Sequence, residues 1–153
     1  MEKLTENMIC WAESKLGSAE YAGWCLAFVE DALEISNHIE IVVKDCKKAL
    51  KFYKDMFGFE LIRDNDGNME LSENLYLQEE KYWERFTGRC VIPQSNLAEL
   101  YFEEPEIDSF VKKLGMLFPD IEYVNRLMTH SWGQRVVRFY DPDGNLIEVG
   151  TPV

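Results

Sequence analysis

The spacing of apolar residues changes near residue 38, and this change divides the chain into two parts. Over residues 6–34 apolar side chains recur at helical spacing, with a break at Gly17. From His38 the stretch HIEIVVKD is rich in β-branched residues and partly alternates, which is typical of a strand. We therefore expect an N-terminal helical extension over 1–36 and a second domain over 37–153.

Residues 38–80 predict the order strand, helix, strand, strand, strand. After HIEIVVKD, the stretch CKKALKFYKDMFG has apolar side chains on one helical face and lysines on the other, and Gly58 is a good helix stop. The segments FELIRD, MELSE and LYLQEE have the composition of strands, and NDGN is a hairpin turn between the first two.

The same order recurs after residues 81–96, which we interpret as a less regular linker. AELYFEE predicts a strand, PEIDSFVKKLGML a helix, and IEYVNRLMTH, QRVVRFYD and NLIEVG three more strands. The two halves share little identity, so the repeat is one of topology. We predict an α+β fold in which two β-α-β-β-β units form one curved, barrel-like mixed sheet around a cavity.

A single carboxylate, Glu148, interrupts the apolar last strand, which follows the tight turn DPDGN. Burying an unpaired carboxylate is costly, so something must compensate its charge. Side chains alternate along a strand, which places Glu148 opposite its apolar neighbours. The same parity places His38 and Glu99 opposite the apolar residues of their strands. We expect this polar set to face the cavity.

One imidazole and two carboxylates would make a hard, mostly oxygen site. With waters completing the shell, such a site suits Mn²⁺, Fe²⁺, Ni²⁺ or Mg²⁺ better than tetrahedral Zn²⁺. The metal would polarise a carbonyl, and Glu99 or Glu148 would move a proton. Alternatively, His38 caps the adjoining helices, Glu99 is an ordinary acid at a strand start, and a wet polar pocket binds an organic molecule without metal.

The stretches HIEIVVKDCKKALKFYKDMFGFEL and WGQRVVRFYDPDGNLIEVG make residues 38 to 151 resemble the vicinal oxygen chelate superfamily, which includes glyoxalase I, bleomycin-resistance proteins and extradiol dioxygenases. The resemblance implies four inward positions able to bind a divalent metal. These are His38, Glu99, Glu148 and, where the family often has glutamate, Tyr76. The superfamily hosts isomerases, dioxygenases, thiol transferases and non-catalytic drug binders, so the resemblance implies no single reaction.

Our leading hypothesis is a divalent-metal-dependent enzyme of glyoxalase or dioxygenase type, a lyase or isomerase acting on a small organic substrate. The second is a metal-free binding protein of the bleomycin-resistance type, and the third is an interaction module that uses the N-terminal helices. Family members commonly pair their units across a dimer, which leaves a homodimer open.

Further pocket residues follow from position along the chain. Gln78 shares a strand face with Tyr76, and Tyr101 shares one with Glu99. The segment THSWGQR would form a pocket mouth, with Trp132 stacking on the substrate and His130 or Arg135 holding an anion. Alternatively, Trp132 only anchors a loop.

Composition narrows the partners. The net charge of −12 would repel nucleic-acid phosphates. No apolar run approaches the roughly 18 residues that span a membrane, and the N-terminus lacks a secretory signal, so we expect a cytoplasmic protein. The four cysteines have no CxxC spacing and are expected to be reduced.

The N-terminal segment carries a weaker resemblance. Residues 11–33 resemble the opening of papain-like cell-wall peptidases, with Cys25 at the position of the nucleophile. The chain has only two histidines, and neither lies in that family's context. We therefore favour a helical appendage in which Cys25 is buried and unreactive.

Overall fold

The computed structural model describes residues 38–153. The predicted N-terminal extension, Cys25 and the interaction hypothesis lie outside these residues. No helix among residues 38–153 is long and apolar enough to cross a membrane.

The first unit follows the predicted order. Its elements are β1 (Ile39–Val43), α3 (Cys46–Phe57), β2 (Leu61–Asp64), β3 (Asn68–Leu71), the short 3₁₀ helix η2 (Ser72–Asn74) and β4 (Leu75–Glu79). The side chain of Asp45 caps the start of α3, and Gly58 ends it with a φ of 76°, a left-handed conformation that favours glycine. The strands form one sheet in the order β1-β4-β3-β2, with β1 parallel to β4.

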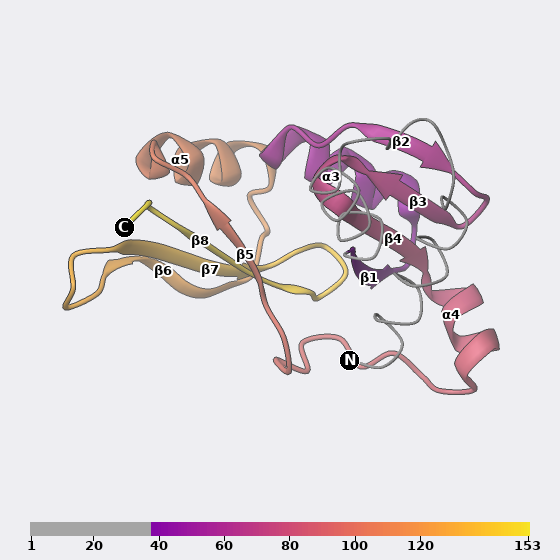
Figure 1. Cartoon of the computed structure of the whole chain (residues 1–153). Helices are drawn as coiled ribbons and strands as arrows, with labels where there is room; N and C mark the ends of the chain where they lie inside the picture. Colours follow the sequence, from indigo (N-terminus) through magenta and orange to yellow (C-terminus); the bar gives the residue numbers. More distant parts are fainter. Residues whose placement is uncertain (1–37) are drawn as a thin grey trace, which may run out of the picture.

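The second unit repeats this arrangement (Figure 1). Its elements are β5 (Leu100–Glu103), α5 (Ile107–Leu117), β6 (Tyr123–Thr129), β7 (Arg135–Tyr140) and β8 (Leu146–Gly150). The sheet order is β5-β8-β7-β6, with β5 parallel to β8. The predicted α+β class and the repeated β-α-β-β-β order are therefore confirmed.

Two predicted features differ from the structure. The described residues form two separate four-stranded sheets, with β1 and β5 at their ends, rather than one continuous curved sheet. Alternation along a strand determines which side chains share a face, but it carries no information on which sheet edges meet. The stretch interpreted as an irregular linker also begins with a helix, α4 (Glu80–Thr87), none of whose residues is fully buried.

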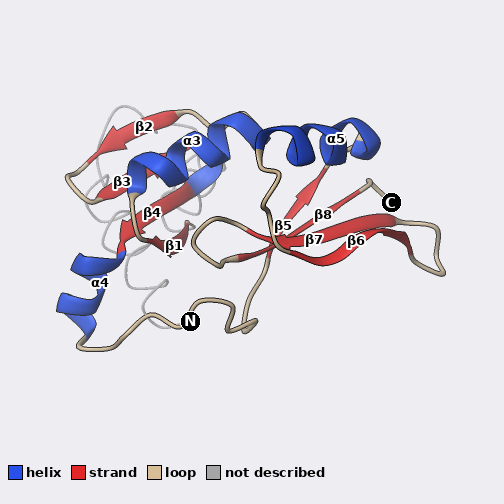
Figure 2. Ribbon diagram, turned by 180° about the vertical axis from the view of Figure 1, so that it is seen from behind, coloured by secondary structure: helices blue, strands red, loops and turns tan. Residues whose placement is uncertain are grey.

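An aromatic cluster joins the two units. Figure 2 shows α3 and α5 following one another along one side of the two sheets. The ring of Phe57 in α3 lies 4.3 Å from that of Phe102 in β5, and the ring of Phe52 lies 4.9 Å from that of Phe118. Both units thus contribute to a single hydrophobic core.

The turn DPDGN also joins the units, besides connecting β7 to β8. Asn145 donates to the carbonyl of Val42 at 3.2 Å, and the backbone N–H of Lys44 donates to Asp143 at 3.0 Å. The hydroxyl of Tyr53 donates to the buried Asp141 at 2.8 Å. Burial, together with this carboxylate, raises the pKa of Tyr53 well above its usual value.

Candidate functional site

Glu148 lies in the middle of the second sheet, and an arginine compensates its charge. Its neighbours Ile147 and Val149 are fully buried on the core face, and Glu148 itself is only 7% exposed. Directly across the ladder in β7 lies Arg138, whose Nη2 forms an ion pair with Oε2 of Glu148. Because an isolated buried carboxylate is strongly disfavoured, this guanidinium explains how the strand holds a charge.

Arg138 contacts two further oxygen atoms. Its Nε lies 3.6 Å from Oε2 of Glu99, and its Nη1 donates to Oδ1 of Asn125 at 3.4 Å. Oε2 of Glu148 accepts no hydrogen bond of good geometry from the described residues, so the ion pair is its main compensation. The structure therefore places Glu99 and Glu148 around a shared guanidinium.

His38, which immediately precedes β1, lies against Tyr76 in β4. Their rings are 4.7 Å apart, and His38 is exposed. Partial burial, followed by the neighbouring Glu70 carboxylate, raises the pKa of Tyr76. The buried Gln78 accepts from Asn68 and donates to the carbonyl of Gly67 at 2.9 Å. These contacts give Gln78 a role in holding the β2–β3 turn.

The candidate metal ligands do not fit a divalent metal within one chain. No group of three or more His, Cys, Asp or Glu side chains is placed to hold an ion among residues 38–153. His38 lies beside the first sheet, whereas Glu99 and Glu148 belong to the second and share Arg138. Binding of a divalent metal by His38, Glu99 and Glu148 together stays a prediction, and metal analysis of the purified protein would test it.

The segment THSWGQR forms the tip of the β6–β7 hairpin. The rings of His130 and Trp132 stack 4.1 Å apart at an interplanar angle of 11°. The indole N–H of Trp132 donates to Gln134, which in turn donates to the hydroxyl of Tyr101 at 2.9 Å. A hydrogen-bonded chain thus runs from the hairpin tip to β5.

Arg135, expected to hold an anion, already has a carboxylate partner. Its two terminal nitrogens donate to Asp108 in α5 at 2.6 and 2.7 Å. The hydrogen bonds from Arg135 lower the pKa of Asp108. An external anion would have to compete with this bidentate pair.

The pocket between the units has a volume of about 570 Å³ and lies beside β1. Its wall comprises residues 39–42 of β1, Trp83, most of the segment 90–100 and residues 143–146 of the turn. Three carboxylates, those of Glu40, Glu99 and Asp143, belong to this wall, and no lysine, arginine or histidine among the described residues 38–153 does. Burial raises the pKa of Asp143, whereas the hydrogen bond from the Lys44 backbone lowers it. We call this cavity the inter-unit pocket.

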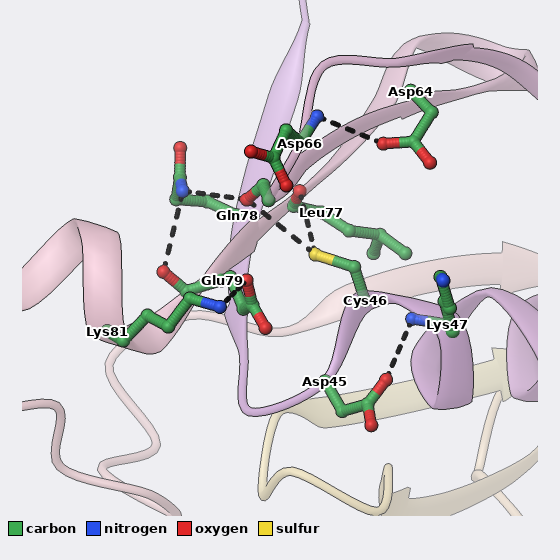
Figure 3. A network of polar contacts seen from close by, with 10 residues as sticks. Asp45, Cys46, Lys47, Asp64, Asp66, Leu77, Gln78, Glu79 and Lys81 are labelled. Atoms are coloured by element: carbon green, nitrogen blue, oxygen red, sulfur yellow. Dashed lines mark hydrogen bonds and ion pairs between the residues drawn. The ribbon is translucent and has the colours of Figure 1, made fainter.

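A second acidic cavity, of about 580 Å³, lies at the start of α3 (Figure 3). Asp45, Asp64, Asp66 and Glu79 surround it, with Lys81 paired to Glu79 at 2.9 Å. The thiol of Cys46 donates to the carbonyls of Leu77 and Gly67. Burial, followed by nearby carboxylates, raises the pKa of this thiol to about 11. Cys46 is therefore a packing residue, because its nucleophilic thiolate form is suppressed.

Comparisons with known proteins agree on the fold. A protein of unknown function from Agrobacterium tumefaciens has a similar structure, with 27% identity over 76% of this chain and 92% of the other, and a TM-score of 0.63. A lactoylglutathione lyase from Agrobacterium tumefaciens is 21% identical over 74% and 90% of the two chains, with a TM-score of 0.60. A glyoxalase/bleomycin resistance protein/dioxygenase from Nocardioides is 19% identical over 75% and 81%, with a TM-score of 0.56.

The sequence comparisons identify the family. Among curated proteins no match is found. The family model described as a glyoxalase-like domain matches residues 36–153. These residues include both β-α-β-β-β units, and the resemblance inferred from the sequence is confirmed. Because the match covers well over half of its length, the chain belongs to the glyoxalase-like domain family.

Proposed function

We propose that the inter-unit pocket binds a small organic molecule that has an apolar body and a positively charged group. The observation that carries this proposal is the pocket wall, in which aliphatic side chains surround three carboxylates and to which residues 38–153 contribute no basic side chain. An apolar cavity of several hundred Å³ with a few polar groups is the usual form of a small-molecule site. The net charge of −12 would further attract cationic ligands to the protein.

This binding needs no resident divalent metal. The pocket wall includes Glu99 but neither His38 nor Glu148, so a ligand there contacts only one of the expected metal ligands. Arg138 of the second sheet supplies a positive charge 3.6 Å from Glu99. We therefore rank the metal-free binding protein first and the metal-dependent enzyme second.

The position of β1 and β5 at the ends of their sheets favours the second candidate. A homodimer that sets β1 of one copy beside β5 of another would bring His38 toward Glu99 and Glu148 of the second copy. Such an assembly would allow the lyase, isomerase or dioxygenase chemistry expected from the resemblance. Analytical ultracentrifugation with and without added Mn²⁺, Ni²⁺ or Zn²⁺ tests it: a metal-dependent dimer lost on His38→Ala supports the enzyme.

Three probes of similar size but different charge test the first candidate: benzyltrimethylammonium, benzyl alcohol and phenylacetate. We expect calorimetry to show the tightest binding for the cation. Glu40→Gln should weaken that binding about fivefold, since a solvent-accessible ion pair contributes about 1 kcal/mol. Glu106→Gln is the matched control, because Glu106 is an exposed acid outside the pocket wall. Equal binding of phenylacetate, or no binding of any probe, would contradict the proposal.

A further inference from the structure

We propose that Arg138 takes the place of a divalent cation in the second sheet. Its guanidinium is a permanent counter-ion for Glu148 and Glu99, and its removal should convert these side chains into a site for a hard metal ion. This inference does not depend on the ligand of the inter-unit pocket, because neither Arg138 nor Glu148 belongs to the pocket wall. It is incompatible with the second candidate function, in which Glu99 and Glu148 bind a metal beside Arg138.

The geometry supports it because three oxygen ligands meet at one guanidinium. Glu148 comes from β8, Asn125 from β6, and Glu99 immediately precedes β5. Their oxygens contact three different nitrogens of Arg138: Nη2, Nη1 and Nε respectively. Three side chains, from β6, β8 and the residue before β5, therefore converge on the positive centre supplied by β7, as ligands converge on a metal ion.

The charge balance explains why the arginine excludes a metal. Arginine stays protonated at every pH that proteins tolerate, so it cannot release its proton to make room for a second cation. Both carboxylates already interact with the guanidinium, and a divalent ion placed between them would meet its positive charge at close range. Only loss of the guanidinium would free the pair of carboxylates.

The oxygens that remain would form a known type of site. Two carboxylates and one amide carbonyl, completed by water, suit Mn²⁺ or Mg²⁺ better than a soft metal. Mn²⁺ is the better probe, because its paramagnetism reports binding directly. Because the chain would supply only three ligands, Mn²⁺ should bind more weakly than a cation in a fully built protein site.

The experiment titrates Mn²⁺ into the full chain and follows it by electron paramagnetic resonance and by thermal unfolding. Wild-type protein should not bind Mn²⁺ at this site. Arg138→Ala should bind one equivalent, and Mn²⁺ should raise its unfolding temperature, so a destabilised variant still gives an answer. Arg138→Lys keeps the positive charge and should bind no more Mn²⁺ than the wild type.

Two results would overturn the proposal. One is stoichiometric Mn²⁺ binding by the wild type that is lost on Glu148→Gln, because a metal would then coexist with Arg138. The other is an Arg138→Ala variant that neither binds Mn²⁺ nor is stabilised by it. The double variant Arg138→Ala with Glu148→Gln is the control, and it should lose the Mn²⁺ binding gained by the single variant.

Discussion

The two units place side chains in equivalent rows across their four strands, yet only one unit buries a carboxylate. Each row consists of one residue from every strand, and neighbouring residues in a row are paired in the ladder. The first row runs across β1, β4, β3 and β2, and the second across β5, β8, β7 and β6. The first row is Glu40, Tyr76, Glu70 and Arg63, and the second is Tyr101, Glu148, Arg138 and Asn125.

The difference lies in the position of the arginine. In the first unit it stands on β2, where the Arg63 side chain is 68% exposed and lies 3.8 Å from Glu70. In the second unit it stands one strand further in, where the Arg138 side chain is 23% exposed beside a Glu148 side chain that is 9% exposed. An arginine on β7 lets the neighbouring strand β8 hold the buried carboxylate of Glu148. The equivalent position on β4 in the first unit is Tyr76, which carries no charge to compensate.

The largest effect should come from removing each arginine. Arg138→Met leaves Glu148 buried without compensation and should lower the free energy of unfolding by about 3 kcal/mol. Arg63→Met breaks an exposed pair and should cost at most about 1 kcal/mol. Urea unfolding of the two variants measures both values. Equal losses would mean that the two rows do not differ in the way described.

An intermediate effect should come from making the first row imitate the second. Tyr76→Glu places a carboxylate beside Glu70 and should lower the free energy of unfolding by about 2 kcal/mol through like-charge repulsion and lost packing. Adding Glu70→Arg should recover roughly 1 kcal/mol, because it restores the glutamate–arginine pairing of β8 and β7. A double-mutant cycle that includes Glu70→Arg alone isolates the coupling. A coupling free energy of zero between the two substitutions would show that facing positions in the ladder are not enough to form the glutamate–arginine pair.

The smallest effect concerns Asp143, through which the second unit contacts Lys44, the residue that follows β1 in the first. Burial raises its pKa in the folded state, so its contribution to stability is greatest below about pH 4, the unfolded value, and is lost as the pH rises through the folded pKa. Asp143→Asn keeps the acceptor for Lys44 and should be more stable at pH 7 by about 0.5 kcal/mol at most, since solvent screens this half-buried group.

Unfolding the wild type and Asp143→Asn at pH 3 and pH 7 provides the measurement. The two proteins should have the same stability at pH 3, where both side chains are neutral. A variant that is less stable at pH 7 would show that the negative charge itself is used there.

Periodicity predicted the order of strands and helices because alternation and helical stripes reflect burial directly. It missed α4 although Tyr82, Trp83 and Phe86 stand at helical spacing, because the helix has only eight residues and lies in a polar stretch that was interpreted as a linker. It also could not show that the two sheets stay separate, because pairing between distant edges depends on tertiary packing.

Parity placed Glu99 and Glu148 opposite the apolar residues of their strands, but it did not predict that Arg138 contacts both carboxylates. A signal for it was present in the turn. If β7 and β8 pair around Asp143, the residue five positions before it faces the residue five positions after it, and these are Arg138 and Glu148. The partner of a charged strand residue can therefore be sought by reflection through a hairpin turn.

The aromatic cluster of Phe52, Phe57, Phe102 and Phe118 has a consequence for folding. Since each unit supplies rings to the other, neither has a complete core by itself. The two units should melt in one cooperative transition. The exposed segment after α4 joins them without contributing to that core, so a chain cleaved at Arg89 should still reassemble from its two fragments.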